Sequence, residues 1–145
     1  YYAGKGHVIA DEVPDGWDAN TTQFYRRIDG LMLAGGEYTA IAIKCTRADF
    51  RRETEEKRRA WRNVTSRFIY AAPAGVIPVE ELPPYAGLWE FGENKYGEMT
   101  VTAVKRAVKN KTPEPLPQQV ITAMFYRAAK AEAGRVRRAR RPRRR

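Results

Sequence analysis

RIDGLMLAGGEYTAIAIKCTR, residues 27–47, is the stretch that decides the fold. Two runs rich in apolar and β-branched residues flank Gly35-Gly36, which is typical of a β-hairpin with a two-residue turn. The turn fixes the pairing of the two strands, because each step away from it brings the next two residues opposite each other. This register predicts that Asp29 faces Ala42.

One face of the hairpin carries polar groups. Side chains alternate along a strand, so Asp29, Ala42 and Lys44 are expected to project together. The other face is expected to point into the core, with Ile41, Ile43 and Cys45. A carboxylate and a lysine on a half-buried face need an explanation, since burying charge is costly.

Two explanations account for these charges. A hard divalent cation could bind next to Asp29, because Mg²⁺ takes carboxylate oxygens, waters and substrate phosphate as ligands. Lys44 would then orient the attacking water or stabilise charge on the phosphate, as in metal-assisted phosphodiester hydrolysis. The plain alternative is a cross-strand salt bridge between Asp29 and Lys44.

The rest of the chain predicts a single α/β domain with a mixed sheet. Thr46 and Asp49 resemble a capping box, and apolar positions at helical spacing predict one helix from there to Val64. Further strands are expected at 7–13, 67–72, 86–91 and 99–104, with one helical turn at 78–82. The domain plan is a core over 1–108, a proline-rich linker over 109–117, a helix over 118–134 ending at Gly134, and an arginine-rich tail over 135–145.

Charge is concentrated at the C-terminus. The formal net charge is +10, and the eight arginines of the tail leave only +2 for the other residues. Such a tail is either a phosphate-binding arm or a solvated end.

Composition excludes several classes of protein and site. The sole cysteine, Cys45, rules out an internal disulfide and fits a reducing compartment. An apolar run near 18 residues is absent, so we expect no transmembrane helix, and no signal peptide is visible. The chain begins with Tyr1, so an upstream segment is expected. A glycine-rich phosphate loop, a Cys/His zinc cluster and a Ser-His-Asp arrangement are all lacking.

The hairpin residues resemble the PD-(D/E)XK nuclease superfamily, which has an acid on one strand and acid-x-Lys on the next. Asp29 matches the first acid, Lys44 matches the lysine, and Ala42 stands where the second acid belongs. The similarity spans roughly residues 11–91 and is strongest to MmcB-like DNA repair proteins and phage nucleases. It rests on the segments Ile43–Phe50, Pro73-Ala74-Gly75, Leu82-Pro83 and Ala86-Gly87-Leu88.

The resemblance implies a restriction-endonuclease-like fold and a DNA endonuclease that depends on Mg²⁺ or Mn²⁺. Asp29, the acid missing at Ala42 and the backbone carbonyl of Ile43 would hold the metal, and Lys44 would serve the nucleophile. Glu12 is the candidate for a further acid, with Asp11 or Asp15 as substitutes. The DNA backbone would contact Arg47, Arg51, Arg137, Arg138, Arg140 and Arg141. A homodimer and the cytoplasm of a bacterium or phage-infected cell are also expected.

Ala42 has three explanations. An engineered knockout is favoured, because every other motif position is intact, and in that case this chain is inactive. A natural copy that binds without cleaving is the second. The third is a migrated acid, Glu53 or Glu56 on the following helix, which ranks lower because Glu55 and Glu56 fit a solvated helix surface. The rival functions are a non-catalytic nucleic-acid-binding pseudonuclease and, more distantly, a basic RNA-associated protein.

Overall fold

The computed structural model describes residues 8–13 and 28–139, with side chains described over 28–134. Its centre is a six-stranded sheet in which the strands follow each other in sequence order. The strands are β1 (Val8–Val13), β2 (Ile28–Ala34), β3 (Glu37–Ile43), β4 (Arg67–Pro73), β5 (Gly87–Glu93) and β6 (Met99–Lys105). The pairs β3–β4 and β4–β5 are parallel and the others antiparallel, so the sheet is mixed as predicted.

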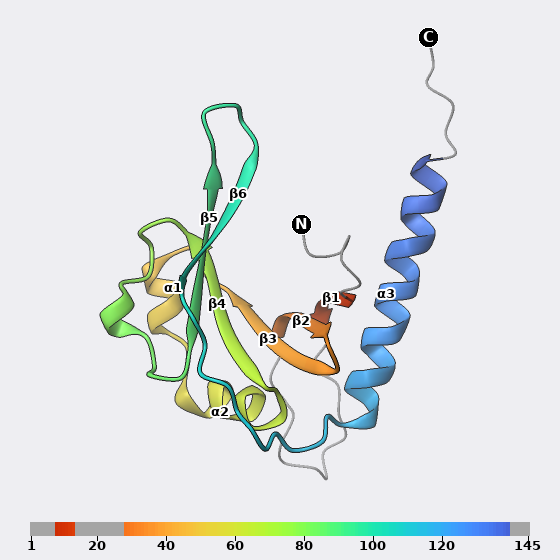
Figure 1. Cartoon of the computed structure of the whole chain (residues 1–145), viewed down its shortest axis with the longest axis horizontal. Coiled ribbons are helices and arrows are strands. Elements are labelled where there is room, and N and C mark those ends of the chain that lie inside the picture. Colours follow the sequence, from red (N-terminus) through yellow and green to blue (C-terminus); the bar gives the residue numbers. More distant parts are fainter. Residues whose placement is uncertain (1–7, 14–27, 140–145) are drawn as a thin grey trace.

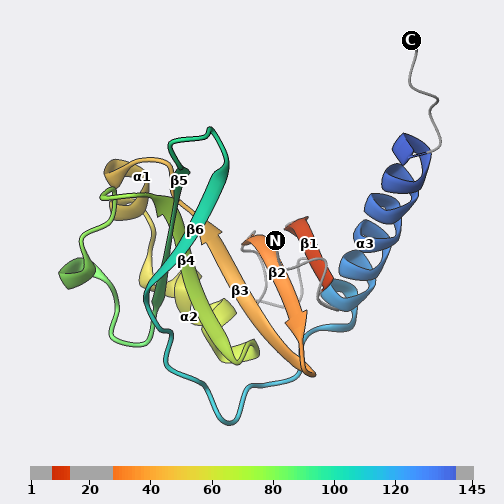
Figure 2. The same ribbon diagram turned by 45° about the horizontal axis from the view of Figure 1, so that its top comes forward.

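Helices flank this sheet (Figure 1). The chain crosses from β3 to β4 through α1 (Arg47–Arg51) and α2 (Glu55–Val64), as a parallel connection requires. A 3₁₀ turn, η2 (Val79–Glu81), lies between β4 and β5. The last helix, α3 (Gln118–Ala139), runs alongside β1 at the edge of the sheet (Figure 2). The result is an α/β fold with a mixed sheet and flanking helices.

The core lies between the sheet and the α1–α2 crossover. Trp61 of α2 is 2% exposed, and Phe68 and Tyr70 of β4 are 1% and 0% exposed. The rings of Phe50 and Phe68 both meet Tyr70 edge-on, with centroids 5.1 and 5.2 Å away. Edge-to-face contacts of this kind favour one fixed arrangement of the rings, so the strand that carries Tyr70 is firmly anchored.

The predicted faces of β3 are wrong at its end. Ile43 is 44% exposed and Cys45 is exposed, whereas Ala42 and Lys44 are buried. The α1–α2 crossover covers the face that carries positions 42 and 44, so this is the core face despite its lysine. Ile41 is only half-buried.

Two helix predictions also need correction. The single helix expected up to Val64 is divided into α1 and α2, because Thr54 begins a new helix by accepting a hydrogen bond from the Lys57 N–H at 3.3 Å. At the C-terminus, Gly134 does not end the helix, which continues to Ala139. A glycine costs a helix only about 1 kcal/mol relative to alanine, and the alanines and arginines around it are good helix formers.

The segment 109–117 has no helix or strand, as expected of a linker, but it is attached to the domain. The backbone N–H groups of Asn110 and Glu114 donate to the carbonyls of Ser66 and Asn63, each at 2.8 Å. Leu116 is 8% exposed. The path to α3 is therefore fixed against the end of α2.

Candidate functional site

The hairpin register is as predicted. Gly30 pairs with Ile41 and Leu31 with Ala40, so the next step brings Asp29 opposite Ala42. On the other side of β3, Ala42 pairs with Tyr70 of β4. Asp29, Ala42 and Tyr70 thus form one row across three strands.

Glu12 extends this row on β1. Asp11 pairs with Gly30 and Val13 with Ile28, which places the backbone of Glu12 opposite Asp29. Its side chain lies outside the described side chains, as does that of Asp11. Asp15 lies outside the described residues altogether.

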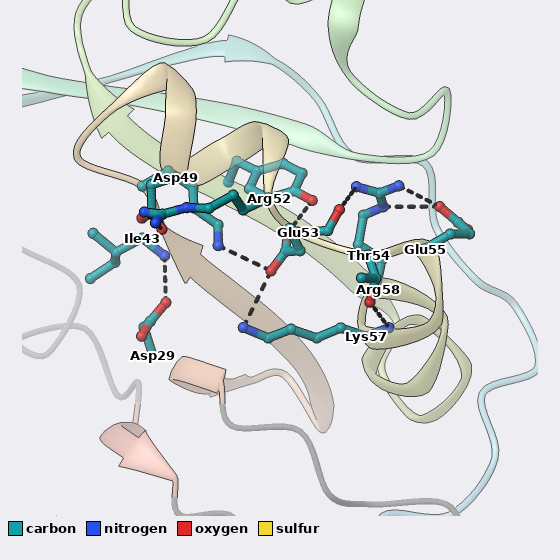
Figure 3. A network of polar contacts seen from close by, with 11 residues as sticks. Asp29, Ile43, Asp49, Arg52, Glu53, Thr54, Glu55, Lys57 and Arg58 are labelled. Carbon is teal, nitrogen blue, oxygen red and sulfur yellow. Dashed lines mark hydrogen bonds and ion pairs between the residues drawn. The ribbon is translucent and has the colours of Figure 1, made fainter.

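The side chain of Asp29 adds a hydrogen bond between β2 and β3, beyond the last backbone pair of the two strands. Its Oδ2 accepts a hydrogen bond from the backbone N–H of Ile43 at 2.8 Å (Figure 3). The carboxylate therefore lies beside Ile43, the last residue of β3. The carbonyl of Ile43, rather than this N–H, was the group predicted to help hold a metal.

Lys44 is buried and pairs with an acid that does not belong to the hairpin. Its Nζ lies 3.2 Å from Oε1 of Glu53, and the two side chains are 7% and 1% exposed. The predicted alternative, a salt bridge from Lys44 to Asp29, is not among the ion pairs of the described residues. A buried lysine is stable only when its charge is matched, and Glu53 supplies the match.

Three side chains surround the Glu53 carboxylate. Tyr70 donates its hydroxyl to Oε2, and Lys57 brings its Nζ within 3.4 Å of Oε1, on which Lys44 also converges. Neither ammonium makes a well-directed hydrogen bond to Oε1, which is buried without a hydrogen-bond partner. Burial, and then the charge of Glu53, raise the pKa of Tyr70 well above its usual range, so its hydroxyl stays a donor.

The break between α1 and α2 is what places Glu53 here. Thr46 caps α1 through a 3.1 Å hydrogen bond from the Asp49 N–H, as predicted. Residues 53 and 54 then leave the helical path, and Thr54 caps α2. Glu53 lies in this short link, and its contacts with Tyr70 and Lys44 hold its carboxylate beside β4 and the end of β3 (Figure 3).

Glu53 was named from the sequence only as a less favoured candidate. The missed signal is Thr54-Glu55-Glu56, a capping residue followed by two acids, which is typical of a helix start. Glu56, the other candidate, is exposed on α2.

Two of the six arginines predicted to contact nucleic acid are paired with an acid. Arg47 and Arg51 both bind Glu81 of η2, with Arg51 Nη2 at 2.9 Å from Oε1. Hydrogen bonds from Arg51 and Arg47 lower the pKa of Glu81 to about 2. Both arginine side chains remain more than half exposed, at 51% and 58%.

Only some of the predicted tail arginines lie within the described residues. Arg137 and Arg138 lie within α3, beyond residue 134, where the described side chains end. Arg140 and Arg141 lie outside the described residues. The tail therefore begins as a helix rather than as an extended end.

The carboxylates present are of the kind that a small divalent cation binds. Mg²⁺ is usually bound by one or two carboxylates together with waters and phosphate. The carboxylates of Asp29 and Glu53 lie near the end of β3, as does that of Asp49 (Figure 3). The buried Oε1 of Glu53 lacks a hydrogen bond and could accept a cation. Within residues 28–134, no group of three or more His, Cys, Asp or Glu side chains gathers as a metal site.

Comparisons with known proteins reveal the fold but no family. No protein-family model matches the chain, and no curated protein matches it. One solved structure with a similar fold is the SPO1766 protein of unknown function from Silicibacter pomeroyi. Its TM-score is 0.57 at 22% identity, over 98% of this chain and 85% of that one. In the part of this chain that the structure describes, no helix has the length and apolarity needed to cross a bilayer.

Proposed function

We propose that this chain is a metal-dependent DNA nuclease of the PD-(D/E)XK type in which Glu53 supplies the carboxylate that Ala42 lacks. The observation that carries the proposal is the buried Glu53 carboxylate, 3.2 Å from Lys44 and hydrogen-bonded to Tyr70 in the row of Ala42. An acid, a lysine and a second acid would thus meet on the face that the motif predicts.

Each residue has a definite role in this proposal. Asp29 and Glu53 would hold Mg²⁺ or Mn²⁺, with a further contribution from Glu12 or the carbonyl of Ile43. The bound cation would polarise the phosphodiester and make a water a better nucleophile. Lys44 would orient that water or stabilise charge on the phosphate, and Tyr70 would fix the direction of the Glu53 carboxylate.

A second candidate is a pseudonuclease that binds DNA without cleaving it. One observation favours it: Lys44 and Lys57 already neutralise Glu53, so the carboxylate is stable without a metal. The arginine-rich tail would supply affinity for any polyanion, because phosphate contacts carry no sequence information. The proposed homodimer and cytoplasmic location apply equally to both candidates.

Cleavage assays separate the two candidates. Single- and double-stranded DNA, with RNA as a third substrate, are incubated with the chain as written and Mg²⁺ or Mn²⁺, with and without EDTA. Glu53→Gln and Lys44→Met should each lower the cleavage rate about 100-fold or more, because they remove charges that act on the transition state. Glu80→Gln, the same change at an exposed glutamate, is the matched control and should leave the rate unchanged.

The outcomes are distinct. Metal-dependent cleavage that is lost in Glu53→Gln but kept in Glu80→Gln supports the migrated acid. Cleavage that appears only in Ala42→Glu points to the missing acid and contradicts the role of Glu53. A folded chain that binds DNA but stays inert in both forms is the pseudonuclease, and preference for RNA would favour the RNA-associated protein.

A further inference from the structure

Two ammonium groups converge on one buried carboxylate oxygen. Lys44 Nζ lies 3.2 Å and Lys57 Nζ 3.4 Å from Oε1 of Glu53. The hydroxyl of Tyr70 donates a hydrogen bond to the other carboxylate oxygen, Oε2. One cation is enough to neutralise one carboxylate. The second is surplus for Glu53 alone and requires an explanation.

The two lysines are held in different ways. Lys44 follows β3, its backbone N–H donates to the carbonyl of Ala71 at 2.9 Å, and its side chain is 7% exposed. Lys57 extends from the first turn of α2, and its side chain is 27% exposed. Lys57 therefore has access to solvent and can withdraw while Lys44 stays in place.

The ammonium of Lys57 takes the place beside Oε1 of Glu53 that a bound metal ion would take. Figure 3 shows the Lys57 side chain reaching from α2 to Glu53, with Asp29 drawn on the same side of that carboxylate. The formal charges of Asp29, Glu53, Lys44 and Lys57 cancel. A divalent cation added to this balanced group would leave two positive charges in excess, and like charges repel strongly in a poorly solvated site.

We propose that Lys57 is a built-in counter-ion, which occupies the cation position beside Glu53 and must be displaced when a divalent metal binds. This inference rests on the proposed function for the identity of the site. Lys57 is a positioning residue for the metal-free state, in which it keeps the Glu53 carboxylate directed at the row of Asp29 and Ala42. Metal affinity is lowered by the work of displacing it.

The test measures metal binding without substrate. Mn²⁺ is titrated into the full chain, and free Mn²⁺ is followed by electron paramagnetic resonance. Lys57→Met keeps most of the length of the side chain and removes its charge, so it should bind Mn²⁺ at least tenfold more tightly than the unmodified chain. Lys57→Arg keeps the charge and should restore the original affinity to within about threefold.

Controls exclude a general effect of charge. Lys95→Met removes one positive charge at an exposed position in the turn between β5 and β6 and should leave Mn²⁺ affinity unchanged. In Glu53→Gln the gain from Lys57→Met should vanish, because the shared carboxylate is gone. Circular dichroism verifies that each variant is folded.

The results also separate this inference from the proposed function. If the unmodified chain binds Mn²⁺ and Lys57→Met binds it equally or more weakly, the counter-ion role is wrong while the metal site stands. If neither the chain nor Lys57→Met binds Mn²⁺ in the millimolar range, the metal site itself is wrong, and the counter-ion role falls with it.

Discussion

At the scale of single residues, the burial of the Glu53 carboxylate costs the fold free energy. The Glu53 side chain is only 1% exposed, so its carboxylate loses its hydration. Charged and hydrogen-bonding partners must compensate for that loss. Lys44 does this from the position after β3, Lys57 from α2 and Tyr70 from β4. Proteins seldom bury such a group for stability alone, since an apolar replacement is often at least as stable, which is why a functional role for Glu53 is worth testing.

Tyr70→Phe tests the hydrogen bond to Glu53. The variant removes only the hydroxyl and leaves Oε2 of a buried carboxylate without its donor. We expect the free energy of unfolding to fall by about 1.5 to 3 kcal/mol, the range for hydrogen bonds to charged groups. Urea denaturation measures it, with Tyr96→Phe as the control, because Tyr96 is 74% exposed. Equal stability of the two variants would contradict the contact.

Ala42→Glu is expected to be destabilising by itself. Ala42 is 0% exposed, so a larger side chain overpacks the core, which costs about 1 to 3 kcal/mol. It also brings a second carboxylate to Lys44, which already pairs with Glu53. Combining Ala42→Glu with Glu53→Gln removes this repulsion and should recover part of the loss in a thermal melt. If the double variant is no more stable than Ala42→Glu, the two positions do not share one site.

At the scale of elements, the break between α1 and α2 controls the site. Thr54→Ala removes the cap of α2, and we expect a loss of about 1 kcal/mol. Because Glu53 precedes this cap, Mn²⁺ affinity should fall as well. Thr112→Ala, at an exposed threonine before α3, is the control for both measurements. A loss of stability without any change in Mn²⁺ binding would show that the cap does not hold Glu53 in place.

A second contact between elements depends on pH. Arg51 and Arg47 of α1 lower the pKa of Glu81 in η2 from its ordinary value of 4.5 to about 2. A lowered pKa means that the ion pairs stabilise the fold fully above about pH 4.5, and that this contribution disappears as the pH falls toward 2. In Glu81→Gln the stability difference from the unmodified chain should therefore shrink between pH 5 and pH 2. Thermal melts across this range measure it, and a constant difference would contradict the pairing.

The sequence predicts the strands well and this helix break poorly. The Gly35-Gly36 turn determines the β2–β3 register, and its pairs are as predicted. The break is hidden because Phe50, Trp61 and Val64 keep helical spacing across it, and all three are buried. Periodicity alone cannot distinguish one helix from two that share a buried face. The burial of Glu53 follows from that break, which only the capping signal at Thr54-Glu55-Glu56, and not the periodicity, could have indicated.

At the scale of the whole molecule, the candidate site and the arginine-rich end are carried by different elements. The site lies where β2, β3 and the α1–α2 crossover meet, while α3 runs along β1 (Figure 2). Composition predicts where the charge accumulates, because eight arginines lie within 135–145. It does not predict that α3 extends to Ala139, since Gly134 is a common helix end and only the surrounding helix formers override it.

Removing residues 140–145 tests the tail as a phosphate-binding arm. The truncation keeps all of α3 and deletes five arginines. Each phosphate contact contributes about 0.9 to the slope of log affinity against log salt concentration. The slope for double-stranded DNA should therefore decrease by up to about 4.5, to the same extent on unrelated sequences, in a fluorescence anisotropy titration. The full-length chain with these five arginines changed to glutamine is the matched control and should behave like the truncation. An unchanged slope in both would mean that these arginines are a solvated end, and that any affinity for DNA comes from the domain itself.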